Sequence, residues 1–225
     1  MQYTTPYVPP TLTVDAVIFQ LVDNALHVCL IKRTNDPFKD QWALPGGYSP
    51  EGETTMEALE RIVENKAGIN IVKDLSYIEQ LYTFDTVARD PRGHAVSVTY
   101  TGSGRNITPT SAQGNAAFFP VDALPEIAYD HKDIIAYAHQ RLISKLTYTN
   151  AVYAFLPKRF SLAELQTAYE AIFGHEFDKR NFRKKFLSLG LTEETNEMRR
   201  EGAHRPARLH RFTSDSLEIL SRSFD

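Results

Sequence analysis

Residues 44–69 of the 225-residue chain read LPGGYSPEGETTMEALERIVENKAGI. Glycine and proline crowd the first half of this stretch and predict a loop. Thr54 and Glu57 have the spacing of a helix capping box, and Gly68 stands where a helix commonly ends in a left-handed residue. Between them, one helical face carries the apolar residues Ala58, Leu59, Ile62 and Val63. We therefore expect a loop followed by a helix over residues 54–67.

Short apolar runs lie on both sides of this stretch. The runs 12–19 and 26–31 surround Asp23 and Asn24, which favour a turn, so a hairpin is expected there. Further strands are expected near 78–84, 95–101 and 116–120. Asp130 is expected to cap a helix that turns apolar residues inward, namely Ile134, Ile135, Ala138 and Leu142. The first part of the chain is thus predicted to be mixed α/β.

The spacing within the quoted stretch resembles the Nudix signature. That signature has a glycine, five residues, Glu, seven residues, and then Arg-Glu-aliphatic-x-Glu-Glu-x-Gly-aliphatic. Six residues match it without a gap: Gly47, Glu53, Arg61, Val63, Gly68 and Ile69. The resemblance implies an α/β (α+β) fold for residues 1–147, in which a mixed sheet is sandwiched between helices.

The departures from the signature bear on chemistry. Ile62, Asn65 and Lys66 stand where the family has its three glutamates. Cleavage of a pyrophosphate needs divalent cations, and magnesium prefers carboxylate and water oxygens. The sequence therefore predicts no catalytic residue, no metal site and no required cofactor. An alternative remains open, because a second set of carboxylates shares a helical face: Glu57, Glu60 and Glu64. The preferred interpretation is a solvated face on which Glu57 and Glu64 bracket Arg61.

The family resemblance also implies a cleft for a nucleoside diphosphate joined to another group, commonly ADP-ribose. The planar guanidinium of arginine suits phosphate oxygens. The predicted ligand contacts are Arg33, Asn35, Phe38, Gly47, Glu53, Arg61, Arg89 and Arg92. His94 and His131 have no partner at metal-ligand spacing and are interpreted as structural.

The second part of the chain, residues 148–225, has a different pattern. Ser161 and Glu164 form another capping box, and Gly174 ends the helix that they open. A second helix is expected between Asp178 and Gly190, with Phe182, Phe186 and Leu189 facing inward. Residues 191–212 then predict a β-hairpin. This order is typical of a small winged helix-turn-helix domain.

Basic residues concentrate on the second helix and the hairpin. Residues 178–211 carry 10 basic and 5 acidic side chains, although the whole chain has a net charge of −3. Arginine and lysine can contact phosphates or guanine, and asparagine can contact adenine. The predicted contacts with double-stranded operator DNA are Lys179, Arg180, Asn181, Arg183, Lys184, Lys185, His204, Arg205 and Arg208.

Over its whole length the chain resembles the Nudix-related transcriptional regulators of bacteria. The segments that carry this resemblance are 156–166, 181–185 and 205–209. It implies a homodimeric repressor of NAD biosynthesis or salvage genes, with ADP-ribose or a related nucleotide as effector. A sugar-responsive regulator of the arabinose type remains an alternative within the family. An active ADP-ribose pyrophosphatase is the alternative from another class.

The cysteine count and the distribution of apolar residues indicate the cellular compartment. Cys29 is the single cysteine, so no disulfide can form within the chain. No apolar run reaches the roughly 18 residues that a membrane span needs, and the N-terminus lacks the pattern of a signal peptide. We expect a cytoplasmic protein without a membrane partner.

Overall fold

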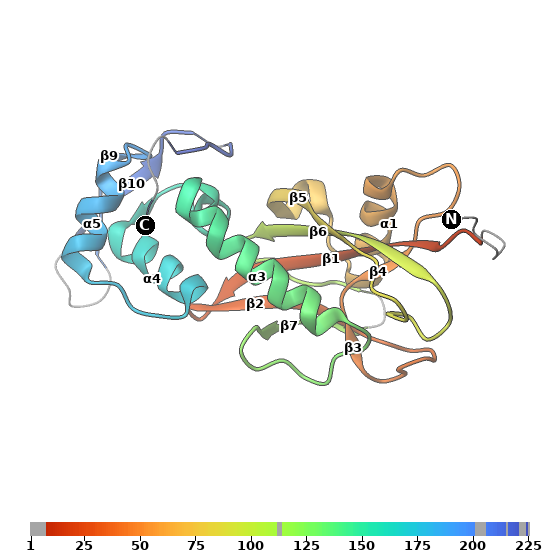
Figure 1. Cartoon of the computed structure of the whole chain (residues 1–225). Helices are drawn as coiled ribbons and strands as arrows, with labels where there is room; N and C mark the ends of the chain where they lie inside the picture. The colour runs from red at the N-terminus through yellow and green to blue at the C-terminus, as the bar shows by residue number, and fades with distance from the viewer. Residues whose placement is uncertain (1–7, 112–113, 201–205, 215, 221–223, 225) are drawn as a thin grey trace.

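The structure, a computed structural model, describes residues 8–111, 114–200, 206–214, 216–220 and 224. Its larger part contains a seven-stranded mixed sheet with the central order β3-β2-β1-β6-β5 (Figure 1). The strand β1 pairs antiparallel with β2 and β4 but parallel with β6, and β7 pairs with β2. The strands are β1 Thr11–Val22, β2 Ala25–Lys32, β3 Trp42–Ala43, β4 Gly46–Tyr48, β5 Leu75–Phe84, β6 Ala95–Gly104 and β7 Ala116–Pro120.

Helices cover both faces of this sheet, as the sequence predicted. Because side chains alternate along a strand, β1 serves both faces. Val14 and Ile18 pack with α1 (Thr55–Ala67), whereas Val17 and Phe19 pack with α3 (His131–Tyr148). The capping box of Thr54 forms as predicted, and Gly68 ends α1 with a φ of 65°. The short helix α2 (Ile71–Asp74) was not expected.

The smaller part is a winged helix, again as predicted. The capping box of Ser161 opens α4, Gly174 ends it in the left-handed region, and β8, β10 and β9 form a three-stranded sheet in that order. The elements are η1 Ala151–Phe155, β8 Phe160–Ser161, α4 Leu162–Phe173, α5 Lys179–Ser188, β9 Thr192–Arg199 and β10 Ala207–Phe212.

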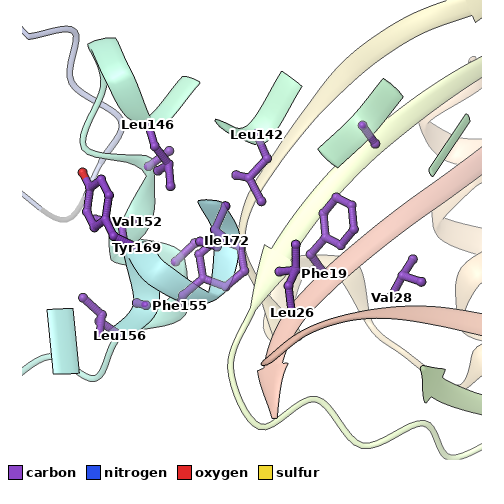
Figure 2. Packing of buried hydrophobic residues seen from close by; sticks show 14 of the residues in the cluster. Phe19, Leu26, Val28, Leu142, Leu146, Val152, Phe155, Leu156, Tyr169 and Ile172 are labelled. Atoms are coloured by element: carbon purple, nitrogen blue, oxygen red, sulfur yellow. The ribbon is translucent and has the colours of Figure 1, made fainter. Parts of the chain in front are cut away.

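One hydrophobic core runs through both parts (Figure 2). Phe19 and Leu26, at the end of the β1–β2 hairpin, belong to the same buried cluster as Ile172 of α4, with Leu142 of α3 between them in the view. His139 Nε2 of α3 donates a 2.6 Å hydrogen bond to the carbonyl of Ile172. The helix α3 therefore packs against the sheet and against the winged helix at once. No helix in the described part of the chain is long and apolar enough to cross a bilayer.

Candidate ligand cleft and nucleic-acid interface

A cleft of about 440 Å³ opens in the larger part beside the second half of α1. Its walls come from β1, the end of β2, the β3–β4 segment, α1, the loop 85–94 and the residues that begin α3. Six of the eight predicted ligand contacts line it: Arg33, Gly47, Glu53, Arg61, Arg89 and Arg92. The folding of the chain thus brings side chains from distant segments to one cleft.

The other two predicted contacts, Asn35 and Phe38, each contact a residue that lines the cleft. The backbone carbonyl of Asn35 accepts a hydrogen bond from Arg33 Nη2 at 3.1 Å. The ring of Phe38 packs edge-on against Tyr129 with centroids 4.7 Å apart. Neither residue is among those that line the cleft. Their direct contact with a ligand stays a prediction.

On α1, Arg61 turns toward Glu53. Arg61 Nε and Nη2 donate to the two carboxylate oxygens of Glu53 at 2.8 and 2.7 Å, which lowers the pKa of Glu53. Arg61 and Glu64 are exposed, as expected for a solvated face, but the carboxylate that binds Arg61 is that of Glu53 and not one of its helical neighbours. Glu57 instead accepts hydrogen bonds from Thr54 in the capping box, and these lower its pKa. A residue outside the helix outcompetes the neighbours on the helical face because its carboxylate meets both guanidinium nitrogens.

The positions of the missing glutamates do not fit a divalent cation. Ile62 is 3% exposed and offers no oxygen. Lys66 directs its ammonium at the carbonyl of Gly46, with Nζ 2.6 Å from the oxygen. Burial of this ammonium lowers the pKa of Lys66, and the nearby Arg33, Arg92 and Arg61 lower it further against the opposing effect of Asp15. Within the described residues, no group of three His, Cys, Asp or Glu side chains is placed to hold a metal ion.

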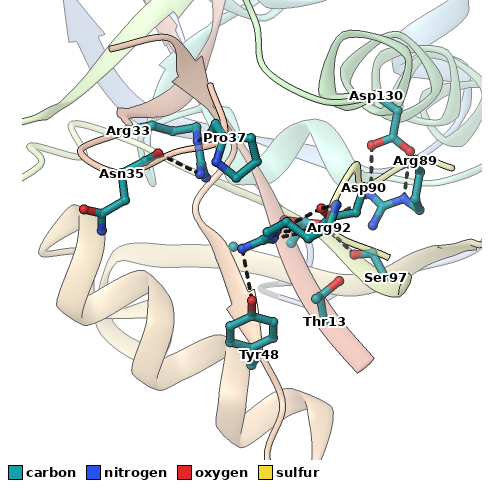
Figure 3. A network of polar contacts seen from close by, with 12 residues as sticks. Thr13, Arg33, Asn35, Pro37, Tyr48, Arg89, Asp90, Arg92, Ser97 and Asp130 are labelled. Atoms are coloured by element: carbon teal, nitrogen blue, oxygen red, sulfur yellow. Dashed lines mark hydrogen bonds and ion pairs between the residues drawn. The ribbon is translucent and has the colours of Figure 1, made fainter. Parts of the chain in front are cut away.

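Arg89 reaches the cleft but is already bound to a carboxylate (Figure 3). Its Nε and Nη2 donate to Asp130 at 2.8 Å each, and Nη2 lies 3.7 Å from Asp15. The side chain of Arg89 is 5% exposed. Asp130 therefore does not cap α3 with its side chain, contrary to expectation, because its carboxylate binds Arg89. This buried pair fixes the loop 85–94 to the start of α3.

Arg92 and Arg33 both approach the aromatic ring of Tyr129 in the cleft wall. Arg92 is held by Asp90 through two nitrogens, at 2.9 and 2.6 Å, and donates from Nη1 to the Tyr48 hydroxyl at 3.0 Å (Figure 3). The hydrogen bonds to Asp90 raise the pKa of Arg92. The guanidinium carbons of Arg33 and Arg92 lie 4.9 and 5.9 Å from the ring centroid of Tyr129. Among the described residues, the buried hydroxyl of Tyr129 has no hydrogen-bond partner.

The cleft residues that were not predicted as contacts include four with polar or aromatic side chains: Tyr48, Lys66, Tyr129 and His131. His131 is buried, and its Nδ1 accepts a 2.9 Å hydrogen bond from the backbone N–H of Leu44. Burial lowers its pKa. The structural role expected for His131 agrees with this bond, although the ring also faces the cleft. No local sequence pattern marks Tyr129 as a cleft residue, so its position there could be learned only from the three-dimensional structure.

In the winged helix, α5 presents most of its cations to solvent. Asp178 caps α5 by accepting from the Asn181 N–H at 2.8 Å, while Phe182 and Phe186 are buried. The residues that are exposed as expected are Lys179, Arg180, Asn181 and Lys184. The two that are half-buried are Arg183, whose Nε is buried without a hydrogen-bond partner among the described residues, and Lys185, whose ammonium lies 5.5 Å from the Phe224 ring centroid.

The hairpin is less basic than its arginines suggest. Arg208 Nη1 binds Glu194 at 2.7 Å, and Arg211 Nε binds Glu193 at 2.5 Å across the β9–β10 pair. Arg159 pairs with Glu197. The strands therefore carry their own counter-charges. The predicted contacts His204 and Arg205 lie outside the described residues.

Fold and site together define a class of protein: a Nudix-type domain with a basic cleft, followed by a winged helix with a basic second helix. Comparison with known families agrees with both parts. The NUDIX domain family matches residues 11–138, and the NrtR DNA-binding winged helix domain family matches residues 152–212. The chain belongs to the NrtR family of Nudix-related transcriptional regulators.

Three relatives are informative. The chain is 34% identical over 220 residues to the ADPR responsive transcriptional repressor NtrR of Acinetobacter baylyi, which covers 95% of this chain and 86% of that protein. Over 132 residues, 57% of this chain and 73% of the relative, it is 38% identical to an ADP-ribose pyrophosphatase of Methanocaldococcus jannaschii.

The third relative, NrtR of Shewanella oneidensis, has solved structures. Its crystal structure in complex with a 27mer DNA has a TM-score of 0.80 at 31% identity, covering 95% of this chain and 99% of that one. A structure of its NUDIX domain with ADP ribose has a TM-score of 0.54 at 34% identity, covering 60% and 90%. The relatives thus include a repressor, a DNA complex and an ADP-ribose complex.

Proposed function

We propose that this protein represses genes of NAD biosynthesis or salvage by binding operator DNA, and that ADP-ribose in the Nudix cleft changes its DNA affinity. One observation carries the proposal. The same chain combines a cation-lined Nudix cleft, in which Lys66 replaces a metal-binding glutamate, with a winged helix whose second helix exposes Lys179, Arg180 and Lys184. The similarity to the repressor from Acinetobacter baylyi and to the Shewanella oneidensis complexes supports DNA as the binding partner and ADP-ribose as the effector.

The cleft suits ADP-ribose by charge and by shape. Its volume lies within the range of small-molecule sites, and its basic side chains can contact a diphosphate. The aromatic rings of Tyr48 and Tyr129 supply flat apolar surfaces next to those charges. For these reasons we propose that Arg33, Arg61 and Arg92 contact the diphosphate of ADP-ribose.

The helix α3 offers a physical connection between cleft and DNA-binding helices. Tyr129 and His131, at its start, line the cleft, and Asp130 holds Arg89. Its 18 residues extend for about 27 Å, and His139 hydrogen-bonds the carbonyl of Ile172 in α4. A ligand alters DNA affinity only if it binds the free and DNA-bound conformations unequally. We propose that movement of α3 carries that difference, and that release of DNA is the response.

We also propose a homodimer in the cytoplasm. One winged helix presents one second helix to one major groove. Two copies related by a two-fold axis would read two half-sites about one DNA turn apart, and would double the number of phosphate contacts.

The test uses the full chain and a fluorescent duplex from the region upstream of its own gene, with a scrambled duplex as control. Fluorescence anisotropy should show specific binding that ADP-ribose weakens. Binding that ignores ADP-ribose would contradict the proposed effector, and a sugar titration would follow. Equal binding to both duplexes would contradict the regulator.

The rival function, pyrophosphatase activity, is tested separately. The 38% identity to the Methanocaldococcus jannaschii enzyme motivates this assay. We expect ADP-ribose to stay intact when it is incubated with the protein and magnesium, because Ile62, Asn65 and Lys66 cannot hold the cation. Release of AMP at about 1 per second would identify an enzyme.

A further inference from the structure

Two of the five cations in the cleft are held differently from the others. Arg61, Arg89 and Arg92 each bind a carboxylate at close range: Glu53, Asp130 and Asp90. Among the described residues, Arg33 and Lys66 donate to backbone carbonyls alone, Arg33 to those of Pro37 and Asn35 and Lys66 to that of Gly46. Within the described part of the chain, neither has a carboxylate at ion-pair distance. Their positive charge is therefore the part of the cleft that a ligand can neutralise.

We infer that the cleft binds a diphosphate without any divalent cation, with the Lys66 ammonium and the Arg33 guanidinium taking the place of the metal. This inference deepens the proposed function and rests on it for the identity of the whole ligand. In a metal-dependent site, carboxylates hold a cation and the cation holds the phosphates. Here the side chains of Lys66 and Arg33 supply the positive charge themselves, so no carboxylates are needed to hold a metal ion.

Local packing supports the position of Lys66. A side chain at Gly47 would place its Cβ 3.1 Å from Ile62 Cδ1, which is tight, and 3.7 Å from Lys66 Nζ, which is van der Waals contact, so the ammonium lies directly beside the backbone of the cleft wall. Ile62 is buried in the core beneath α1. Lys66, four residues later on the same helix, consequently emerges directly above that contact.

The charges around Lys66 disfavour a metal ion. Arg33, Arg61 and Arg92 lie close enough to Lys66 to affect its protonation. A divalent cation at this wall would meet the ammonium of Lys66 and the guanidinium of Arg33, which have no carboxylate at ion-pair distance within the described residues, whereas an anionic ligand would be attracted by both. The carboxylates that line the cleft, Asp15, Glu53 and Asp90, already lie at ion-pair distance from Arg89, Arg61 and Arg92. The same argument applies to any diphosphate, whatever group is attached to it.

The experiment measures binding of ADP-ribose to the full chain by titration calorimetry, once with EDTA and once with excess magnesium. Inorganic pyrophosphate with EDTA is titrated in parallel. We expect ADP-ribose to bind with EDTA, and magnesium to change its Kd by less than about threefold. Lys66→Met should weaken binding about tenfold to a hundredfold, the range expected for a charge-assisted hydrogen bond.

Controls separate charge from folding. Lys66→Arg keeps the charge and should bind within about fivefold of the parent. Lys73→Met, an equivalent change at an exposed lysine outside the cleft, should bind as the parent does. Circular dichroism should show nearly unchanged melting for all three variants, because Lys66 and Lys73 are exposed as whole residues and only the ammonium of Lys66 is buried, against the cleft wall.

The outcomes distinguish the two proposals. Binding of ADP-ribose only with magnesium, or equal affinity for Lys66→Met and the parent, would overturn the metal-free site. If ADP-ribose fails to bind under either condition, the proposed effector is wrong. Pyrophosphate binding with EDTA that depends on Lys66 would then still support the metal-free site, and its absence would overturn that as well.

Discussion

The cleft and the second helix of the winged helix are both basic, but they hold their cations in opposite ways. In the cleft, Arg61, Arg89 and Arg92 each engage one carboxylate through two nitrogens. On α5, Lys179, Arg180 and Lys184 are exposed, and no ion pair to them occurs within the described residues.

The difference corresponds to two kinds of binding partner. A small ligand requires side chains that are fixed before it arrives, and paired carboxylates provide this rigidity. DNA presents a row of phosphates, and mobile cations on a helix can adapt to it while counterions are released. The carboxylates in the cleft also reduce its net charge, which limits competition from unrelated anions. Substitutions in each region test whether the paired cations of the cleft and the exposed cations of α5 differ in this way.

The largest effect is expected from Arg89→Met. Removal of the guanidinium leaves Asp130 and the buried Asp15 without their cation, and breaking such a pair costs about 3 kcal/mol or more in the free energy of unfolding. Urea denaturation followed by circular dichroism measures this cost. Adding Asp130→Asn to this variant should recover part of the lost free energy of unfolding, because it removes an unpaired carboxylate. A loss below about 1 kcal/mol would mean that Arg89 is not a structural cation and is free for a ligand.

Exposed cations should behave differently. Arg180→Ala combined with Lys184→Ala should weaken operator binding about a hundredfold, since each contact to DNA contributes roughly 1–3 kcal/mol. Stability should change by less than about 0.5 kcal/mol, because both side chains are at the surface. Anisotropy with the upstream duplex and urea denaturation measure the two quantities.

Lys73→Ala with Lys132→Ala, two exposed lysines of the Nudix domain, is the matched control and should keep full DNA affinity. The α5 variant should also bind ADP-ribose normally. If its DNA affinity were unchanged, α5 would not be the helix that contacts DNA.

A smaller effect is expected at the aromatic wall of the cleft. Tyr129→Leu removes the ring that both Arg33 and Arg92 approach, and it should weaken ADP-ribose binding about tenfold through loss of two cation–π contacts. Tyr129→Phe retains the ring and lacks only the hydroxyl. Equal affinity of the Phe variant and the parent, measured by calorimetry, would assign the role to the ring, whereas a matching loss in both variants would assign it to the hydroxyl.

Local patterns were sufficient to predict α1 and α4 with both of their ends. Thr54 with Glu57 and Ser161 with Glu164 interact over three residues, so the sequence contains the whole motif. The apolar faces followed from periodicity for the same reason.

Contacts between distant segments could not be read in this way. Asp130 was expected to cap α3, yet it binds Arg89, which is 41 residues away. Arg61 prefers Glu53 in the preceding loop over its helical neighbours. Tyr129 and Lys66 became cleft residues only when the loop 85–94, α1 and the start of α3 came together. The family resemblance therefore predicted six of the residues that line the cleft, while the other lining residues and the pairing between side chains required the structure.

The smallest effect on DNA affinity is expected at Arg208, which is exposed like the cations of α5 but paired with a carboxylate like those of the cleft. Arg208 was predicted to contact DNA, but it forms an exposed ion pair with Glu194, with side chains 57% and 58% exposed. Such a pair contributes about 0–1 kcal/mol, so DNA can compete for the arginine at little cost. Arg208→Ala should therefore weaken operator binding only about threefold, because the loss of one phosphate contact is partly offset by the pair that no longer has to break.

Glu194→Gln sharpens this point because it frees Arg208 and removes a carboxylate that repels phosphate. We expect it to tighten operator binding about threefold and to make the affinity fall more steeply with salt. Anisotropy titrations over a series of salt concentrations measure both. If Glu194→Gln left affinity and salt dependence unchanged while Arg208→Ala also had no effect, the hairpin strands would lie away from the DNA, and α5 would carry the interaction without them.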